Sequence, residues 1–156
     1  MEELLENTSI DHKVLGFCLD HKFFNKTKNI LENEMFSGHL KEIFTTISFA
    51  HTNYENNLSR DELFALHVDR HPAMPSSTKN EIMSIIKLLP PDANNYELQM
   101  DVVKNFWLRD RARVIGEKAI SIFTGQDEDF GELQRIMDTV ENGRMDSKAT
   151  YTEVES

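Results

Sequence analysis

The fold is decided by residues 108–140, which read LRDRARVIGEKAISIFTGQDEDFGELQRIMDTV. Apolar residues recur at steps of three and four on both sides of a short polar turn at residues 124–127. The row before the turn is Leu108, Ala112, Ile115, Ala119 and Ile122, and the row after it is Phe130, Leu133, Met137 and Val140. Such steps place side chains on one face of a helix, and a short connection makes consecutive helices antiparallel neighbours. The sequence therefore predicts a helical hairpin with these two rows at its seam.

Four further apolar residues of this stretch lie off the two rows: Val114, Ile120, Phe123 and Ile136. A hairpin buries only one side of each helix, so we expect these side chains to stay exposed in a single subunit. Contiguous exposed apolar surface usually marks an interface. We therefore predict self-association through the hairpin, with the nine row residues as the candidate self-association or partner interface. The alternative is that the rest of the chain folds back and covers the exposed side chains.

The remaining sequence predicts an all-α fold, because Gly and Pro number only 6 and 4 and apolar residues keep helical spacing. Three domains are expected: a helical globular head at residues 1–92, a long helix with the hairpin at 93–145, and a polar linker or tail at 146–156. Helices are expected at about 10–19, 22–32, 39–52, 60–71, 78–89, 95–123 and 129–142. The fourth begins with a capping box, Ser59 to Glu62, and Pro72 ends it.

The long helix at 95–123 carries two apolar rows on different faces. Tyr96, Met100, Val103 and Trp107 form the first row, which we expect to pack on the head. The second row begins at Leu108 and belongs to the hairpin. One helix is therefore expected to serve both bodies.

The formal net charge of −10 argues against nucleic-acid binding by this chain alone, because phosphate backbones attract cationic surfaces. One local basic stretch exists on the long helix, formed by Lys104, Arg109, Arg111, Arg113 and Lys118. Carboxylates are interspersed with these cations, which is typical of a solvated face with ion pairs. A DNA-facing or partner-facing patch is the alternative interpretation.

The single cysteine, Cys18, excludes an internal disulfide and fits a reducing compartment. Its apolar neighbours predict a small core residue rather than a nucleophile. No secretory signal or membrane-spanning run is visible. The sequence therefore predicts a cytoplasmic protein without a membrane partner.

The motifs of common catalytic sites are not found. The sequence contains no Gly-x-x-x-x-Gly-Lys-Ser/Thr phosphate loop, no dinucleotide-binding glycine motif and no cysteine pair for zinc. His67 and His71 lie one helical turn apart, as a metal site could require, but Pro72 follows at once. Basic side chains near a helix C-terminus are favoured by the helix dipole alone. We expect no catalytic, cofactor-binding or metal-ligating residues in this chain.

Several short motifs follow one another in an order seen in one protein family. Residues 11–20 read DHKVLGFCLD and are followed by the aromatic pair Phe23-Phe24. Then come Met35-Phe36 with Ile43-Phe44, the dipeptide Ala93-Asn94, and RDRA at residues 109–112. In this order, and with the terminal hairpin, the chain resembles the N-terminal domain of DnaB-type replicative DNA helicases over about residues 11–144. The resemblance implies the same all-α fold.

Two departures resemble the T4-like phage helicases more than the bacterial enzymes. Five extra residues separate DVV at 101–103 from RDRA at 109–112, and the link at 90–92 reads PPD. The ATPase motor of these helicases is absent from the sequence, so the chain resembles an excised domain. A phage origin would imply the cytoplasm of a bacterial host.

The resemblance implies a collar function rather than an enzymatic one. In this family the domain forms a collar in which head and hairpin contacts alternate around a hexamer, as a trimer of dimers. Primase and helicase loaders dock on the collar during DNA replication, within the primosome. ATP and magnesium are expected only in the motor, so the full-length protein would be an ATP-dependent DNA helicase. The nine row residues of the hairpin are the interface residues that the resemblance carries over.

Three alternatives remain open at this point. The helicase-interacting domain of a primase resembles the same fold, although the motif order and the chain beginning at Met1 favour the helicase. An unrelated acidic helical module for protein interaction would form a monomer or a simple dimer. A metal-dependent helical enzyme would use His67 and His71.

Overall fold

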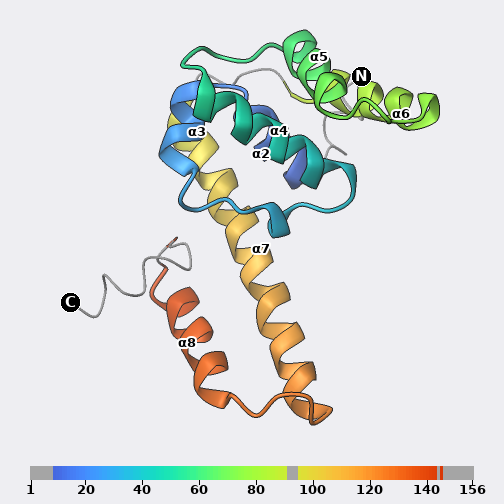
Figure 1. Ribbon diagram of the computed structural model, residues 1–156. Helices are drawn as coiled ribbons and strands as arrows, with labels where there is room; N and C mark the ends of the chain where they lie inside the picture. Colours follow the sequence, from blue (N-terminus) through green and yellow to red (C-terminus); the bar gives the residue numbers. More distant parts are fainter. Residues whose placement is uncertain (1–8, 91–94, 144, 146–156) are drawn as a thin grey trace.

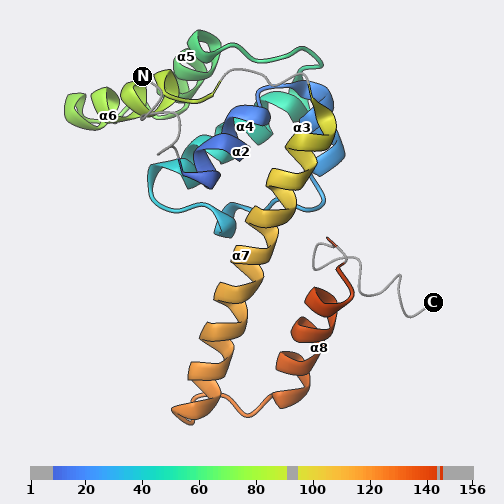
Figure 2. The ribbon, with the colours of Figure 1, turned by 180° about the vertical axis from the view of Figure 1, so that it is seen from behind.

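The computed structural model describes residues 9–90, 95–143 and 145, and every regular element within these ranges is a helix. Figure 1 shows a head built from the shorter helices and a long helix, α7, that leaves the head with α8 returning beside it. The view from behind shows the same arrangement (Figure 2). The predicted all-α fold, with a small head followed by a long helix and an antiparallel hairpin, is confirmed.

The helix bounds follow the predicted ones with small shifts. In chain order the elements are α2 (Ile10–Phe17), α3 (His21–Thr27), the 3-10 turn η1 (Asn33–Met35), α4 (His39–Asn53), α5 (Arg60–Arg70), α6 (Ser76–Lys87), α7 (Tyr96–Phe123) and α8 (Phe130–Glu141). The second helix ends earlier than predicted, because the amides of Ile30 and Leu31 both hydrogen-bond to the Thr27 carbonyl and close a tight turn. The predicted linker and tail at 146–156 lies outside the described residues.

The head is centred on α4, whose side chains Ile43 and Ile47 have no exposed surface. Aromatic residues join α4 to the elements around it. The Phe36 ring lies 4.7 Å from the Phe44 ring and 5.1 Å from the Phe106 ring, measured between centroids. The chain after η1 is thereby held between α4 and α7, and the head has one contiguous apolar core.

Gly16 on α2 allows a close approach between two distant segments. A Cβ at this position would lie 2.8 Å from the carbonyl oxygen of Pro90, a distance that real Cβ contacts do not reach. The glycine of the Val14-Leu15-Gly16 motif is therefore required by packing. It lets α2 lie against the chain that follows α6.

Local capping explains where several helices begin. The Ser59 hydroxyl accepts the Glu62 amide at 3.1 Å, and the Glu62 carboxylate accepts the Ser59 amide at 2.9 Å, so the predicted capping box is confirmed. The same amide lowers the pKa of Glu62. Asn95 caps α7 by accepting the Leu98 amide at 3.1 Å.

The long helix α7 has 28 residues and spans about 40 Å at the usual rise. All of its buried residues lie between Gln99 and Asp110, and Trp107 is only 1% exposed. The start of the predicted head-facing row is looser: Tyr96 is 44% exposed, with the Lys26 ammonium 4.4 Å from its ring centroid. The first half of α7 thus completes the head, and the second half projects from it (Figure 1).

The connection between α7 and α8 is held by glycine geometry and one ion pair. Gly125 has a φ of 84°, which only glycine adopts without strain. The Lys118 ammonium pairs with the Asp127 carboxylate across the turn, and the Asp129 side chain accepts the Glu132 amide at 2.9 Å to cap α8. Gly143, with a φ of 69°, follows the end of α8 as predicted.

Candidate interaction surface on the helical hairpin

The contact between α7 and α8 uses a different face of α8 from the one that the sequence predicts. Ile136 is 6% exposed and Thr139 is 8% exposed, and they are the only buried residues of α8. The expectation that Ile136 stays exposed is therefore wrong. Thr139 can be buried because its hydroxyl donates to the Arg135 carbonyl at 2.9 Å, which satisfies its polar group locally.

The nine predicted interface residues lie beside the seam, where solvent reaches them. Five are half-buried and four are exposed. The half-buried ones are Leu108, Ile115, Ile122, Leu133 and Val140; the exposed ones are Ala112, Ala119, Phe130 and Met137. The two predicted rows are real apolar rows, but neither forms the fully buried seam between the two helices.

The solvent-facing apolar rows of the two helices lie on the same side of the hairpin. With about 100° between successive residues, the α7 row is turned by roughly a quarter of a circle from the residues that face α8. The exposed residues Phe130 and Met137 are turned in the same sense from Ile136 on α8. Because the helices are antiparallel, equal turns place both rows on one side. We call this surface the hairpin face: the α7 row from Leu108 to Ile122 with Phe123, together with Phe130, Leu133 and Met137.

Several large side chains at or beside the hairpin face are highly exposed. Phe123 is 89% exposed, Phe130 66% and Ile120 64%. The prediction that Ile120 and Phe123 stay exposed is confirmed, whereas Val114 is half-buried. Phe123 ends α7 and Phe130 begins α8, so two phenylalanine rings lie at the tip of the hairpin (Figure 1). Exposed aromatic rings on a projecting rod are typical of a protein-interaction surface.

The basic stretch of α7 is largely neutralised by the chain itself. The Asp110 carboxylate, only 5% exposed, binds the guanidinium of Arg111 at 2.9 Å and that of Arg113 at 2.7 Å. Arg113 also binds Glu117 at 2.9 Å, and its hydrogen bond with Asp110 raises its pKa. With Lys118 paired to Asp127, three of the five cations have intramolecular partners. For these three, the ion-paired interpretation is confirmed.

The burial of Asp110 is a feature that the sequence analysis missed. Acidic residues within a basic helix are expected to lie at the surface and pair with the cations there. The spacing of Asp110 and Glu117 does not show which of the two is buried. The arginines on either side of Asp110, at 109, 111 and 113, are the signal that could have identified it. In the structure two of these guanidinium groups, those of Arg111 and Arg113, bind Asp110. A carboxylate in such a position can be buried because charged hydrogen bonds replace its water.

His67 and His71, the two residues of the alternative metal-site interpretation, form hydrogen bonds within the chain. The rings of His67 and His71 lie 4.3 Å apart, but His67 Nδ1 hydrogen-bonds to the Thr46 hydroxyl at 2.8 Å and His71 Nδ1 to the His67 carbonyl at 2.7 Å. Burial lowers the pKa of His67 to about 4, with His71 as the next cause. Among residues 9–90, 95–143 and 145, no three ligand-type side chains come together as a metal site.

A second histidine pair, between His21 and His51, was not predicted because the residues are far apart in sequence. His51 Nε2 lies 2.7 Å from the Cys18 carbonyl oxygen, so it carries the proton, and His51 Nδ1 accepts from His21 Nδ1 at 2.9 Å. Burial lowers the pKa of His51. Cys18 is fully buried, as predicted, and its burial raises the pKa of the thiol.

Comparison with protein-family models, with curated proteins and with solved structures found no match to this chain. None of the described helices is both long and apolar enough to cross a membrane.

Proposed function

We propose that this chain is the N-terminal collar domain of a DnaB-type hexameric replicative helicase, which assembles subunits and provides a docking surface for primase or a loader during DNA replication. The single observation that carries the proposal is the hairpin face. It is an apolar surface on a rod that projects from the head, with Phe123 89% exposed at its tip. A surface of this kind excludes water only when a second protein covers it.

The motif residues that carry the resemblance have packing roles that support the proposal. Gly16 permits contact with Pro90, and the Phe36 ring stacks on Phe44 and contacts Phe106 at a tilted angle. These residues come from three separated motifs, yet they connect α2, α4 and α7 around one core. Ala93-Asn94 lies outside the described residues. The resemblance therefore draws on positions that determine how the long helix leaves the head.

The charge distribution fits a collar that leaves DNA binding to the motor. The chain has a formal net charge of −10. In its most basic stretch, Arg111, Arg113 and Lys118 form ion pairs with the carboxylates of Asp110, Glu117 and Asp127. In such an assembly the collar brings neighbouring motors together, so that nucleotide can be hydrolysed between them. No catalytic role is proposed for this chain.

Analytical ultracentrifugation of the purified chain, over a concentration series, tests the self-association. We expect mass above the monomer to increase with concentration. Phe123→Asp should weaken this association by about tenfold or more, because it places a charge within the proposed apolar contact. Tyr54→Asp is the matched control, since Tyr54 is 58% exposed but lies after α4 on the head.

Two outcomes would contradict the collar function. One is a strict monomer at every concentration, and the other is a Phe123→Asp chain that associates as strongly as the parent. Circular dichroism of both variants should match the parent, because neither side chain is buried.

The primase-domain and unrelated-module alternatives are separated by a second measurement. The coding sequence after Ser156 should contain a Gly-x-x-x-x-Gly-Lys-Ser/Thr phosphate loop if the chain belongs to a helicase. A frame without this loop, or with primase catalytic motifs before Met1, would reject the collar assignment. Self-association without the loop would favour an acidic interaction module.

A further inference from the structure

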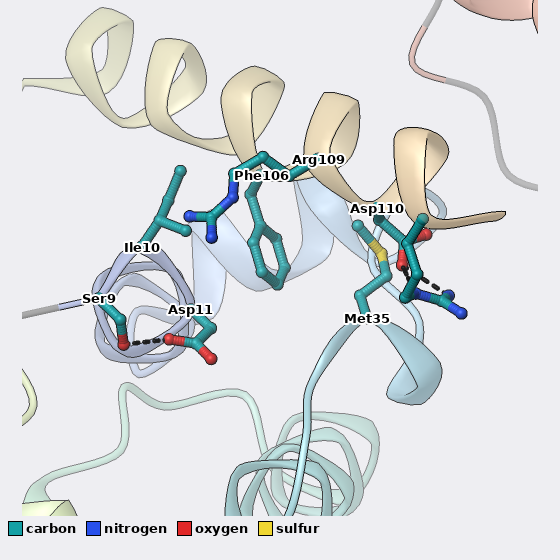
Figure 3. Close-up of a pocket in the computed structure, with 8 residues that line it drawn as sticks. Ser9, Ile10, Asp11, Met35, Phe106, Arg109 and Asp110 are labelled. Atoms are coloured by element: carbon teal, nitrogen blue, oxygen red, sulfur yellow. Dashed lines mark hydrogen bonds and ion pairs between the residues drawn. The ribbon is translucent and has the colours of Figure 1, made fainter. Parts of the chain in front are cut away.

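A hollow lies beside the start of α2, next to η1 and the middle of α7 (Figure 3). Its volume is about 300 Å³, which is at the lower end of the range for small-molecule sites. The Phe106 ring extends into it, and the half-buried side chains of Ile10 and Met35 line it from the other elements. The hollow therefore has an apolar part formed by these three side chains, and its other lining residues are polar or charged: Ser9, Asp11, Arg109, Asp110 and Arg113.

Arg109 is the cation of the hollow that forms no ion pair within the part of the chain that the structure describes. Figure 3 shows its side chain reaching from α7 toward the start of α2. The second arginine of the hollow, Arg113, is held by Asp110 and Glu117. Arg109 forms neither an ion pair nor a hydrogen bond with any residue of the described ranges. Its guanidinium group is available for a carboxylate, which it can bind through two parallel hydrogen bonds.

Asp11 supplies an opposite charge on the wall formed by α2. Its Oδ1 atom accepts from the Ser9 hydroxyl and from the His12 amide, and the His12 ring nitrogen Nδ1 lies 3.3 Å from the same oxygen. Its Oδ2 atom accepts from no described residue. Burial raises the pKa of Asp11, but hydrogen bonds from Ser9 and His12 outweigh this and lower it overall. The carboxylate is thus ionised at neutral pH with one oxygen open.

Arg109 and Asp11 line the same hollow, and the ion-pair partner of Asp11 among the described residues is the ring of its neighbour His12, not Arg109. Two opposite charges and an apolar part in one hollow match a ligand that carries both complementary charges on a small apolar body. We propose that the hollow binds a free amino acid with an apolar side chain. Its carboxylate pairs with Arg109, its ammonium group with Asp11, and its side chain packs on Phe106. This site is independent of the proposed collar function, because it does not involve the hairpin face.

Isothermal titration of the whole chain with three probes tests this site. L-Leucine carries both charges, 4-methylpentanoate lacks the ammonium group, and 3-methylbutylamine lacks the carboxylate. We expect leucine to bind, and each analogue to bind about tenfold more weakly or worse, since each leaves one charged wall unpaired. The result would be overturned by an absence of leucine binding, or by an analogue that binds as tightly as leucine.

Two variants test whether leucine binds through the two charged residues of the hollow. Arg109→Gln and Asp11→Asn should each weaken leucine binding by about tenfold. Lys104→Gln is the matched control, because Lys104 is an exposed cation of α7 that does not line the hollow, and it should bind leucine like the parent. Unchanged binding in Arg109→Gln would overturn the site.

Glycyl-leucine distinguishes a free amino acid from the ends of a peptide, because its charges are farther apart. Weaker binding of this dipeptide than of leucine supports the proposal. Tighter binding would overturn the assignment to a free amino acid. Amide spectra recorded during the titrations, with shifts confined to the start of α2 and the middle of α7, place the bound leucine in the hollow.

Discussion

The head and the hairpin are made from similar amphipathic helices, but they differ in how many neighbours each helix has. In the head, α4 contacts α2, α3, α5 and η1, and its inward side chains lose all contact with water. In the hairpin, α8 has α7 as its main neighbour, and only Ile136 and Thr139 are buried on it. Two helices alone cannot enclose a core. The difference indicates that the described head encloses its own core, whereas the described hairpin leaves an apolar side exposed to solvent.

Exposed apolar side chains are also found on the head, but they are scattered. Tyr54 follows α4 and Leu88 follows α6, at 58% and 56% exposed. Single exposed apolar residues are normal in a soluble protein. Those of the hairpin face share one side of a projecting rod, and grouping of this kind is more typical of an interface than scattered exposure is.

The largest expected effect tests whether the head is a self-sufficient core. Ile43→Ala should lower the free energy of unfolding by about 2–5 kcal/mol, because Ile43 has no exposed surface and its loss leaves a cavity. Urea denaturation followed by circular dichroism measures this. A change below about 1 kcal/mol would mean that the head is loosely packed, and the contrast with the hairpin would fail.

Acid should weaken the head through His67. Its pKa is about 4 in the folded chain and about 6.5 when unfolded, so the unfolded chain binds the proton more readily. The contribution of His67 to the free energy of unfolding is therefore fully present above pH 6.5. This contribution should fall by about 3 kcal/mol between pH 7 and pH 4. His67→Gln should flatten that part of the pH profile measured by urea denaturation. An identical slope in this variant would contradict the assignment.

Asp110 tests the junction between head and hairpin. Asp110→Asn should lower the free energy of unfolding by about 1–3 kcal/mol, because Arg111 and Arg113 lose the carboxylate that binds both. Thermal unfolding measures the change, and Glu117→Gln is the control at a more exposed carboxylate of the same network. Equal effects of the two variants would indicate that burial of Asp110 has no energetic importance.

The smallest expected effect is that of truncating Phe123, which tests directly whether the hairpin face is unpacked in the monomer. Phe123→Ala should change the free energy of unfolding of the monomer by less than about 0.5 kcal/mol, because an 89% exposed side chain loses little contact on truncation. Urea denaturation at a concentration where the chain is monomeric is the measurement. A loss as large as that of Ile43→Ala would show that Phe123 is packed within its own chain.

The helices and the hairpin could be predicted from sequence because local signals specify them. Apolar spacing, the Ser59 capping box and the short polar turn before Phe130 all act over a few residues, and the structure follows them. The face on which α8 contacts α7 could not be predicted in the same way. Leu133 and Val140 share a face with Ile136 on one side and with Met137 on the other, so both seams satisfy the helical period. The choice depends on three-dimensional packing, including a buried threonine that polarity alone would place outside.

Contacts between residues far apart in the chain could not be predicted from the sequence either. The hollow depends on the start of α2 lying beside the middle of α7, which brings Asp11 near Arg109 across most of the chain. The hydrogen bond between His21 and His51 depends in the same way on how α3 packs against α4. Residue types at these positions carry no spacing signal, because helical period describes neighbours along one helix only.

The continuity of α7 has a mechanical consequence. The helix contains no proline and one glycine along its 28 residues, so it has no built-in hinge between the Trp107 level and the tip. A protein that grips the tip therefore pulls on a stiff lever arm whose other end is anchored among the aromatic rings around Phe36. A force at Phe123 is therefore transmitted along α7 to the contacts around Phe36. A protein bound at the tip could in this way change the angle between α7 and the head.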